Sequence, residues 1–204
     1  MPQRSKQPAR RISAKESIRD AAAALFAEKG FASASTREIC QRAGITKPVL
    51  YYHFGNKAQL YEELVLDAFN EYQKELRRAA RHPAGPRERL VEVLSAMFSY
   101  ARHRHFYWRI GLRMVFAPEK ESPTINYLEM SRSDEKLLAE IVREGIRRGQ
   151  MRGKAQQVAG SIVGMAMSCI MGYLVTGEPS LDRSTARDII NLLMEGCGKK
   201  PTAR

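Results

Sequence analysis

The sequence predicts an all-α fold, and three observations lead to that prediction. Helix-capping patterns recur along the chain, apolar residues repeat at spacings of three and four, and no segment alternates β-branched with polar residues as a half-buried strand would. The 204 residues suit one or two compact domains, and 44% of them are hydrophobic. A chain of this size can bury its own core without disulfide or metal staples.

The N-terminal helices are expected within residues 13–56, after a disordered basic arm of residues 1–12. Residues 13–16 have the form of a capping box, and Gly30 supplies a stop for the helix that follows. A second capping box, at 35–38, opens a short helix. These signals predict two helices from local sequence alone.

A third short helix should begin after Thr46, which can cap it, and end near Phe54. Asn56 with Gln59 resembles a further cap, which would open a long helix to about His82. We expect residues 57–204 to form one helical domain. Its later helices are predicted near 90–98, 106–116, 128–146 and 156–175, with a last one beginning at Asp182 or Ser184.

The net charge is +12, because 34 Lys and Arg outnumber 22 Asp and Glu. Residues 1–60 hold 11 basic and 4 acidic residues, whereas residues 61–204 hold 23 and 18. A basic excess of this size indicates a polyanionic partner, nucleic acid before an anionic membrane surface. The N-terminal third is therefore expected to meet the anion.

The segment 35–54, STREICQRAGITKPVLYYHF, has the layout of a helix-turn-helix. Gly44 supplies the left-handed backbone at the turn at little cost. The second helix would be presented outward, with Thr46, Lys47 and Pro48 near base edges. Tyr51, Tyr52 and His53 lie further along this helix, and their polar tips can reach phosphates. The core that holds the pair is expected to contain Ile39, Ala43, Ile45 and Leu50, packed against Leu25 and Phe26.

The run AGITKPVLYYHFGNKAQL, preceded by STREI at 35–39, resembles the tetracycline-repressor (TetR) type of bacterial transcription regulator. The similarity covers about residues 13–64, and it is specific because many residues agree in order and spacing at once. Cys40, Thr46 and Pro48 depart mildly from the family pattern, and only Pro48 touches base reading. The matching residues are Thr36, Ala43, Gly44, Leu50, Tyr51, His53, Phe54, Lys57 and Leu60.

The resemblance implies a homodimer whose first three helices bind double-stranded operator DNA, while the C-terminal helices bind a small-molecule effector and dimerise. It therefore implies a ligand-responsive regulator of transcription, most often a repressor. Phosphate contacts carry over to Thr36, Tyr51, His53 and Lys57. Contacts with bases or nearby sugars carry over to Thr46, Lys47, Pro48 and Tyr52. Charge and position alone add Arg37 and Arg42 to the DNA-binding set.

Residues 155–177 contain no charged side chain over 23 positions, which is long enough to span a bilayer. The segment also holds polar residues and a ladder of small residues that lets two helices approach closely. We therefore expect a buried or intersubunit helix and no membrane partner. The expected dimer interface contains Gly160, Gly164, Ser168, Gly172, Ile189 and Leu193.

An aromatic cluster with two arginines, within residues 106–116, is the best candidate for an effector pocket. Arginine beside aromatic rings would suit a flat or carboxylate-bearing ligand. An ordinary amphipathic helix with solvated arginines is the alternative. The expected lining residues are Phe98, Phe106, Tyr107, Trp108, Arg109, Arg113, Met167 and Met171.

Other function classes find less support in the sequence. Catalytic motifs such as GxSxG and HExxH are absent, so no enzyme, cofactor or metal site is expected. Cys40, Cys169 and Cys197 are scattered, which indicates a reducing cytoplasm as the location of the protein. Cys40 is expected to be a buried structural thiol, with a redox sensor as the alternative. Two further hypotheses stay open: a sequence-indifferent basic DNA-coating protein and a membrane-associated protein built on the uncharged segment.

Overall fold

The computed structural model describes residues 13–196, and within this range it contains nine α-helices and no strand. The prediction of an all-α fold is therefore confirmed. The predicted basic arm of residues 1–12 and Cys197 lie outside the described residues.

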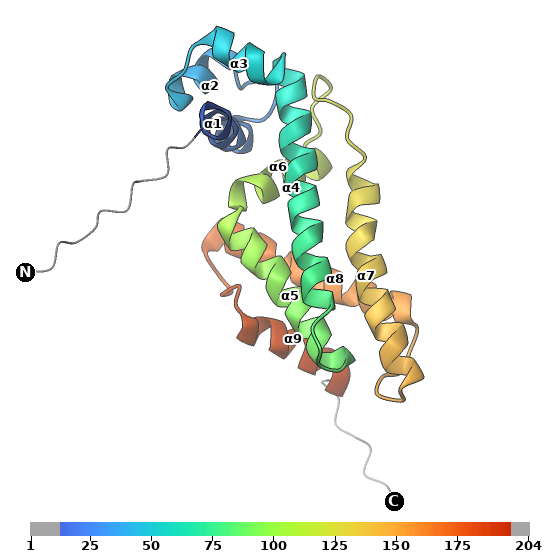
Figure 1. The fold of residues 1–204 in the computed structure, drawn as a ribbon. Helices are drawn as coiled ribbons and strands as arrows, with labels where there is room; N and C mark the ends of the chain where they lie inside the picture. Colours follow the sequence, from blue (N-terminus) through green and yellow to red (C-terminus); the bar gives the residue numbers. More distant parts are fainter. Residues whose placement is uncertain (1–12, 197–204) are drawn as a thin grey trace, which may run out of the picture.

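Three short helices form the N-terminal head: α1 (Ala14–Lys29), α2 (Thr36–Ala43) and α3 (Lys47–Phe54) (Figure 1). Both predicted capping boxes form. The hydroxyl of Ser13 accepts a hydrogen bond from a backbone N–H in the first turn of α1, and that of Ser35 does the same for α2. Each box also returns a glutamate side chain to the cap backbone, so the start of each helix is fixed by its local sequence.

The turn between α2 and α3 depends on Gly44, whose φ of 67° and ψ of 33° place it in the left-handed region. Thr46 occupies the N-cap position of α3, but its side chain makes no capping hydrogen bond. The prediction of a side-chain cap at Thr46 is therefore wrong; Pro48 has no N–H to donate, and the remaining possible donor, the backbone N–H of Val49, is not bonded by the Thr46 side chain. The cap at Asn56 forms as predicted: its side-chain oxygen accepts a hydrogen bond from the backbone N–H of Gln59 at 2.9 Å.

The remaining helices lie close to their predicted positions. The long one ends two residues before the expected His82, and the next begins at a proline, which the first turn of a helix tolerates. Their bounds are α4 (Lys57–Ala80), α5 (Pro86–His103), α6 (His105–Phe116), α7 (Tyr127–Arg147), α8 (Ala155–Thr176) and α9 (Arg183–Glu195).

Buried side chains form two cores that share α4, which runs from the head to the far end of the molecule (Figure 1). Leu60 and Leu64 belong to the core of the head, whereas Tyr72 and Leu76 belong to the second core, between α4, α5, α7, α8 and α9. We refer to this second group of helices as the bundle. The predicted domain boundary after residue 56 stays a prediction, and the packing makes the first half of α4 part of the head.

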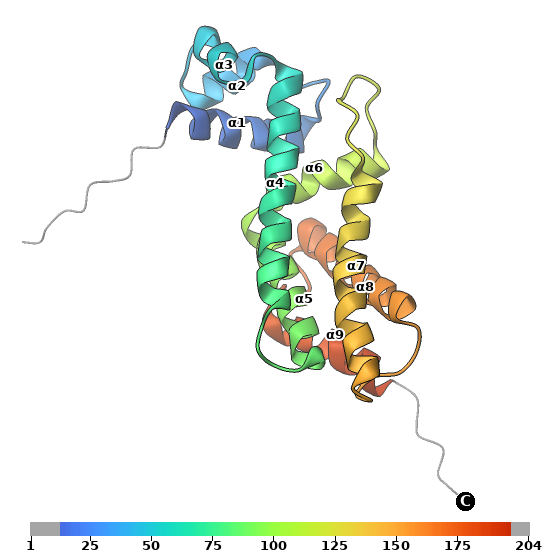
Figure 2. The same cartoon turned by 45° about the vertical axis from the view of Figure 1, so that its right-hand side comes forward.

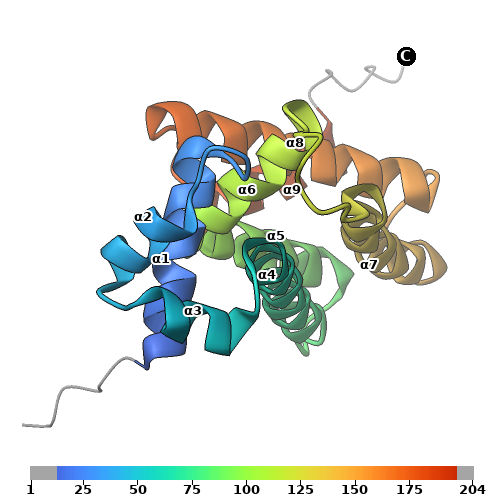
Figure 3. The same ribbon diagram turned by 90° about the horizontal axis from the view of Figure 1, so that it is seen from above.

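Helix α6 crosses between the head and the bundle (Figures 2 and 3). Ile110 is 3% exposed and lies in the core of the head. Trp108 and Leu112, two residues to either side, pack against the core of the bundle. Both cores therefore meet on one short helix.

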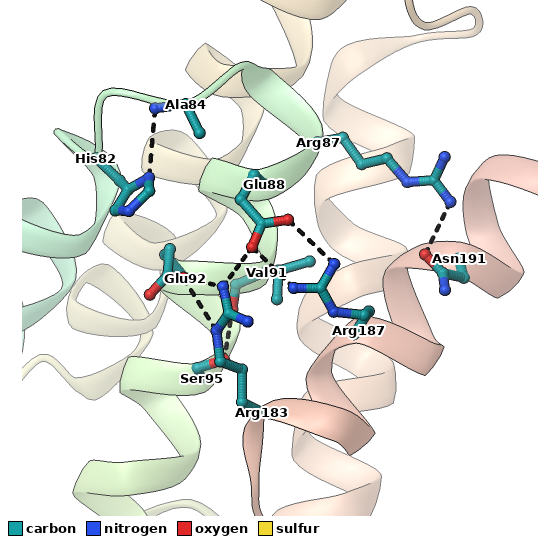
Figure 4. Close-up of polar contacts among 10 residues, drawn as sticks. All are labelled: His82, Ala84, Arg87, Glu88, Val91, Glu92, Ser95, Arg183, Arg187 and Asn191. Atoms are coloured by element: carbon teal, nitrogen blue, oxygen red, sulfur yellow. Dashed lines mark hydrogen bonds and ion pairs between the residues drawn. The ribbon is translucent and has the colours of Figure 1, made fainter.

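Helix α9 is held to α5 by charged groups (Figure 4). The Arg187 guanidinium lies 2.9 Å from a carboxylate oxygen of Glu88, and Arg183 bonds both Glu88 and Glu92. Burial opposes ionisation of Glu88, but the hydrogen bonds and charges of Arg187 and Arg183 bring its pKa below the usual range. These contacts fix the last helix against the bundle.

Helix α8 leaves much of its uncharged surface exposed. By length and composition it is the one described helix that could cross a membrane, and only 28% of its most hydrophobic window is buried. Its inner face packs into the bundle through residues such as Ile162 and Ile170. The outward positions are uncharged and follow spacings of three and four: Gln157, Ser161, Gly164, Ser168, Met171 and Val175.

Candidate DNA-binding surface and ligand cavity

Helix α3 is anchored by two apolar side chains and presents the rest outward. Leu50 is fully buried and Phe54 is 5% exposed, and both belong to the core of the head. Tyr51 is 45% exposed and Tyr52 is 85% exposed, which is unusual for aromatic residues of a folded domain. The structure thus brings the predicted base-reading side chains to one exposed surface; these are Thr46, Lys47, Pro48 and Tyr52.

The side chains predicted to contact phosphates differ in their exposure and in whether they are already paired within the protein. Arg37 is exposed and Thr36 is half-buried, both in the first turn of α2, where backbone N–H groups favour an anion. His53 is half-buried, with its ring centroid 5.2 Å from that of Tyr52. Arg42 donates to Glu28 at 2.9 Å, so part of its charge is already compensated within the head.

Lys57 has an internal role that the sequence did not indicate. Its ammonium donates to the backbone carbonyls of Phe31 and Ala34 at 3.0 and 3.2 Å, and it lies 4.3 Å from the centre of the Phe31 ring. These contacts tie the start of α4 to the loop between α1 and α2. Local sequence gives no signal for them, because the partners lie 23 and 26 residues away.

Glu119, in the connection after α6, also bonds this loop. Its carboxylate accepts the backbone N–H of Phe31 at 3.1 Å and also that of Ala32. A Cβ atom at Gly30 would lie 2.0 Å from this carboxylate, and the φ of Gly30 is 83°. Only glycine therefore suits this position, and sequence analysis missed the role of Glu119.

A cavity of about 310 Å³ opens between α4, α5, α6, α7 and α8. Of the predicted lining residues, it brings together Tyr107, Trp108 and Met167. The lining is mostly apolar and aromatic, which is typical of small-molecule sites. The other lining residues are Val65, Ala68, Phe69, Tyr72, Tyr100, Ile110, Gly111, Leu112, Val115, Phe116, Met130, Asp134 and Val163.

The other predicted lining residues lie elsewhere. Phe98 is fully buried in the core of the bundle, and Phe106 packs against the core of the head. Arg109 donates to the carbonyl of Leu174 at 2.6 Å. Arg113 lies near Gly30 and Glu119. Met171 is 39% exposed on the outer surface of α8. The rotation of α6 and α8 about their axes explains these differences, since spacing alone does not say which face meets a neighbour.

Asp134 is the charged residue in the cavity wall, and sequence analysis did not single it out. It is 8% exposed, and its two carboxylate oxygens accept the Tyr72 hydroxyl and the Gln73 amide, each at 2.7 Å. Burial raises its pKa to about 6, although both hydrogen bonds favour the charged form. Its spacing of four from Met130 and from Leu138 was an available signal, because it places an acid on the inner face of α7.

Two further observations concern polar groups. The indole N–H of Trp108 is buried and has no hydrogen-bond partner among residues 13–196, while the Tyr100 hydroxyl donates to the carbonyl of Ala68 at 2.8 Å.

Cys40 is 6% exposed and burial raises the pKa of its thiol, which favours the structural role. Among the described side chains, no group of His, Cys, Asp or Glu could hold a metal ion.

An exposed helix on a three-helix head, joined to a helical bundle with an apolar cavity, is the arrangement of a helix-turn-helix regulator. Residues 18–64 match the model of the bacterial regulatory proteins of the tetR family. Over these residues the chain carries the DNA-binding motif of this family, and the protein is a DNA-binding regulator of transcription. This result favours regulation over sequence-indifferent DNA coating.

Known relatives agree with this assignment. The transcriptional repressor KstR2 of Mycolicibacterium smegmatis is 29% identical over 148 residues, which cover 68% of each chain. The transcriptional activator FasR of the same organism is 33% identical over 96 residues, covering 47% of this chain and 42% of its own. The TetR family regulator PfmR from Thermus thermophilus has the same fold, with a TM-score of 0.74, 23% identity, and coverage of 89% of this chain and 99% of its own.

Proposed function

We propose that the protein is a homodimeric repressor that releases operator DNA when a small molecule occupies the cavity. One observation carries the proposal: α6 lines the cavity and also packs into the core of the head. A ligand that shifts α6 therefore acts on the DNA-reading helices through direct packing. In this proposal the regulator works in the cytoplasm, where bacterial operator DNA lies.

The reading of DNA uses the exposed surface of α3. Lys47 and Tyr52 would lie at base edges and supply sequence preference, while Arg37 and Tyr51 would bind phosphates and supply affinity. One such helix contacts few base pairs, so discrimination needs two. A dimer that places the two helices about 34–36 Å apart reads a palindrome in successive major grooves.

The outer face of α8 is the surface we assign to the second copy. Its exposed positions are uncharged, and burying them between subunits removes apolar area from water. Gly164 and Ser168, two of the predicted interface residues, are exposed there. Gly160 and Gly172 are half-buried, and Leu193 packs partly against the core. Ile189 is only 7% exposed, so the neighbouring Leu192, at 46%, is better placed to meet a partner.

Two contacts made by α6 and the residues just after it would transmit a change in the cavity to the head. Ile110 of α6 sits in the core of the head, and Glu119, just after α6, holds the loop at Phe31. A ligand changes DNA affinity only if it binds the two arrangements of α6 with different affinity. Displacement of α6 would change the support of α1 and α2, and thereby the spacing of the two heads.

The test compares operator and random duplex DNA at one fixed salt concentration. A regulator should prefer its own promoter fragment by roughly 10³-fold or more, whereas a DNA-coating protein gives a ratio near one. The same titration with a ligand of the cavity should weaken operator binding. A preference that no cavity ligand changes would leave the DNA-binding assignment standing and remove the ligand response.

A further inference from the structure

Asp134 is a buried acid with neutral partners. Within residues 13–196 its carboxylate is bonded by a phenol and a carboxamide, Tyr72 and Gln73, and neither neutralises its charge. A buried ionised carboxylate is costly unless a cation or several hydrogen bonds compensate it. The carboxylate also belongs to the cavity wall, so a bound molecule can supply the missing charge.

The rest of the wall is suited to an organic cation. None of the described residues that line the cavity is Lys, Arg or His, so the wall itself offers the carboxylate no cation. Aromatic side chains that attract cations through their ring faces surround the space: Tyr72, Tyr100, Tyr107 and Trp108. Tyr72 links the two features, since its hydroxyl bonds Asp134 and its ring lies 5.9 Å from that of Trp108.

We propose that the cavity binds an apolar ligand that carries a protonated amine, and that the amine pairs with the carboxylate of Asp134. This inference rests on the proposed role of the cavity as the effector site. The apolar part of the ligand occupies the space between Phe69, Val163 and Met167. An apolar carboxylate of the same size is disfavoured, because it would place a second negative charge beside Asp134. The arginines expected to bind an acidic ligand, Arg109 and Arg113, do not line the cavity.

The sequence offers a direct probe of binding, because Trp108 is its only tryptophan and lies in the cavity wall. We suggest titrating the purified protein with three ligands of one chain length, dodecylamine, dodecanol and dodecanoate, below their micelle concentrations at neutral pH. The change in Trp108 fluorescence gives each dissociation constant. The dissociation constant of dodecylamine is expected to be about tenfold or more lower than that of dodecanol. Dodecanoate should bind weakest of the three.

Two variants separate the charge of Asp134 from other effects. Asp134→Asn should remove the preference for the amine while keeping the binding of dodecanol, which reports that the cavity is intact. Glu140→Gln is the matched control, because Glu140 is an exposed acid on the same helix and does not line the cavity. This control should keep the preference of the parent protein.

Several outcomes would overturn the inference. Dodecanoate that binds as tightly as dodecylamine, or an amine preference that survives in Asp134→Asn, contradicts the pairing. Equal binding of dodecylamine and dodecanol refutes the amine but keeps the cavity as an apolar effector site. No fluorescence response to any of the three ligands refutes the inference and weakens the proposed ligand response, while operator binding is judged separately.

Discussion

Replacing Asp134 with asparagine is expected to stabilise the protein at neutral and higher pH. In the folded protein, burial raises the pKa of Asp134 from its usual value of 3.8 to about 6. A difference of about two pKa units corresponds to about 3 kcal/mol between the protonated and ionised forms. Asparagine keeps the shape of the side chain and removes its ionisation.

The sign follows from the direction of the shift. A pKa that is higher in the folded state favours folding below the unfolded value of 3.8, and this contribution is lost as the pH rises toward about 6. The ionised Asp134 therefore lowers the free energy of unfolding at pH 8 relative to pH 4. Asparagine also leaves one of the two donors, Tyr72 or Gln73, less well bonded, at a cost of about 1 kcal/mol that does not depend on pH.

Urea denaturation of the parent and of Asp134→Asn at about pH 4 and about pH 8 measures the quantity of interest. The difference in free energy of unfolding between the two proteins should change by about 2 kcal/mol in favour of the variant as the pH rises, somewhat less than the full shift because Asp134 of the unfolded chain is already partly ionised at pH 4. Glu140→Gln serves as the control and should show little change, because Glu140 is exposed. A difference that stays constant with pH, or that shifts toward the parent, would refute the burial argument.

Three further substitutions test other contacts. Glu119→Gln weakens the acceptor of the Phe31 and Ala32 amides, so operator affinity should fall several-fold while ligand binding, read from Trp108, is unchanged; unchanged operator affinity measured by gel shift would argue against this link. Lys47→Ala should alter which base pairs are preferred in a selection from random duplexes, and an unaltered preference would show that Lys47 does not read bases. Ser168→Glu places a charge on the exposed face of α8, and light scattering should then show a monomer; a dimer of unchanged affinity would move the interface elsewhere.

Much of the fold could be predicted because its signals are local. Capping boxes at Ser13 and Ser35 and the left-handed glycine at Gly44 set helix ends through contacts that span only a few residues. The exposure of Tyr52 has an equally local cause, because Leu50 and Phe54, four residues apart, are buried and define the inner face of α3. Thr46 occupies the predicted N-cap position but makes no side-chain cap, and Pro48 removes one of its two possible backbone donors.

The cavity could be predicted only in part, because it depends on how distant helices are turned toward one another. Trp108 lies in the cavity wall, but Phe98, ten residues earlier, is fully buried in the core of the bundle and does not reach the cavity. Asp134 comes from a different helix; its spacing from Met130 and Leu138 places an acid on the inner face of α7, but this local pattern does not reveal the cavity beside it. The contacts of Lys57 and Glu119 with one loop have the same character, because they join segments far apart in the chain.

The backbone of Phe31 is bonded by the cation of Lys57 at its carbonyl and by the anion of Glu119 at its N–H, and neither residue belongs to the first three helices. A fragment that stops at residue 56 would lack Lys57, Glu119 and the part of its core supplied by Leu60 and Ile110. The DNA-reading end is consequently not a portable module. A hybrid regulator would keep its reading end intact only if the junction fell near the middle of α4 and the donor of the first segment also supplied α6 and the residues just after it.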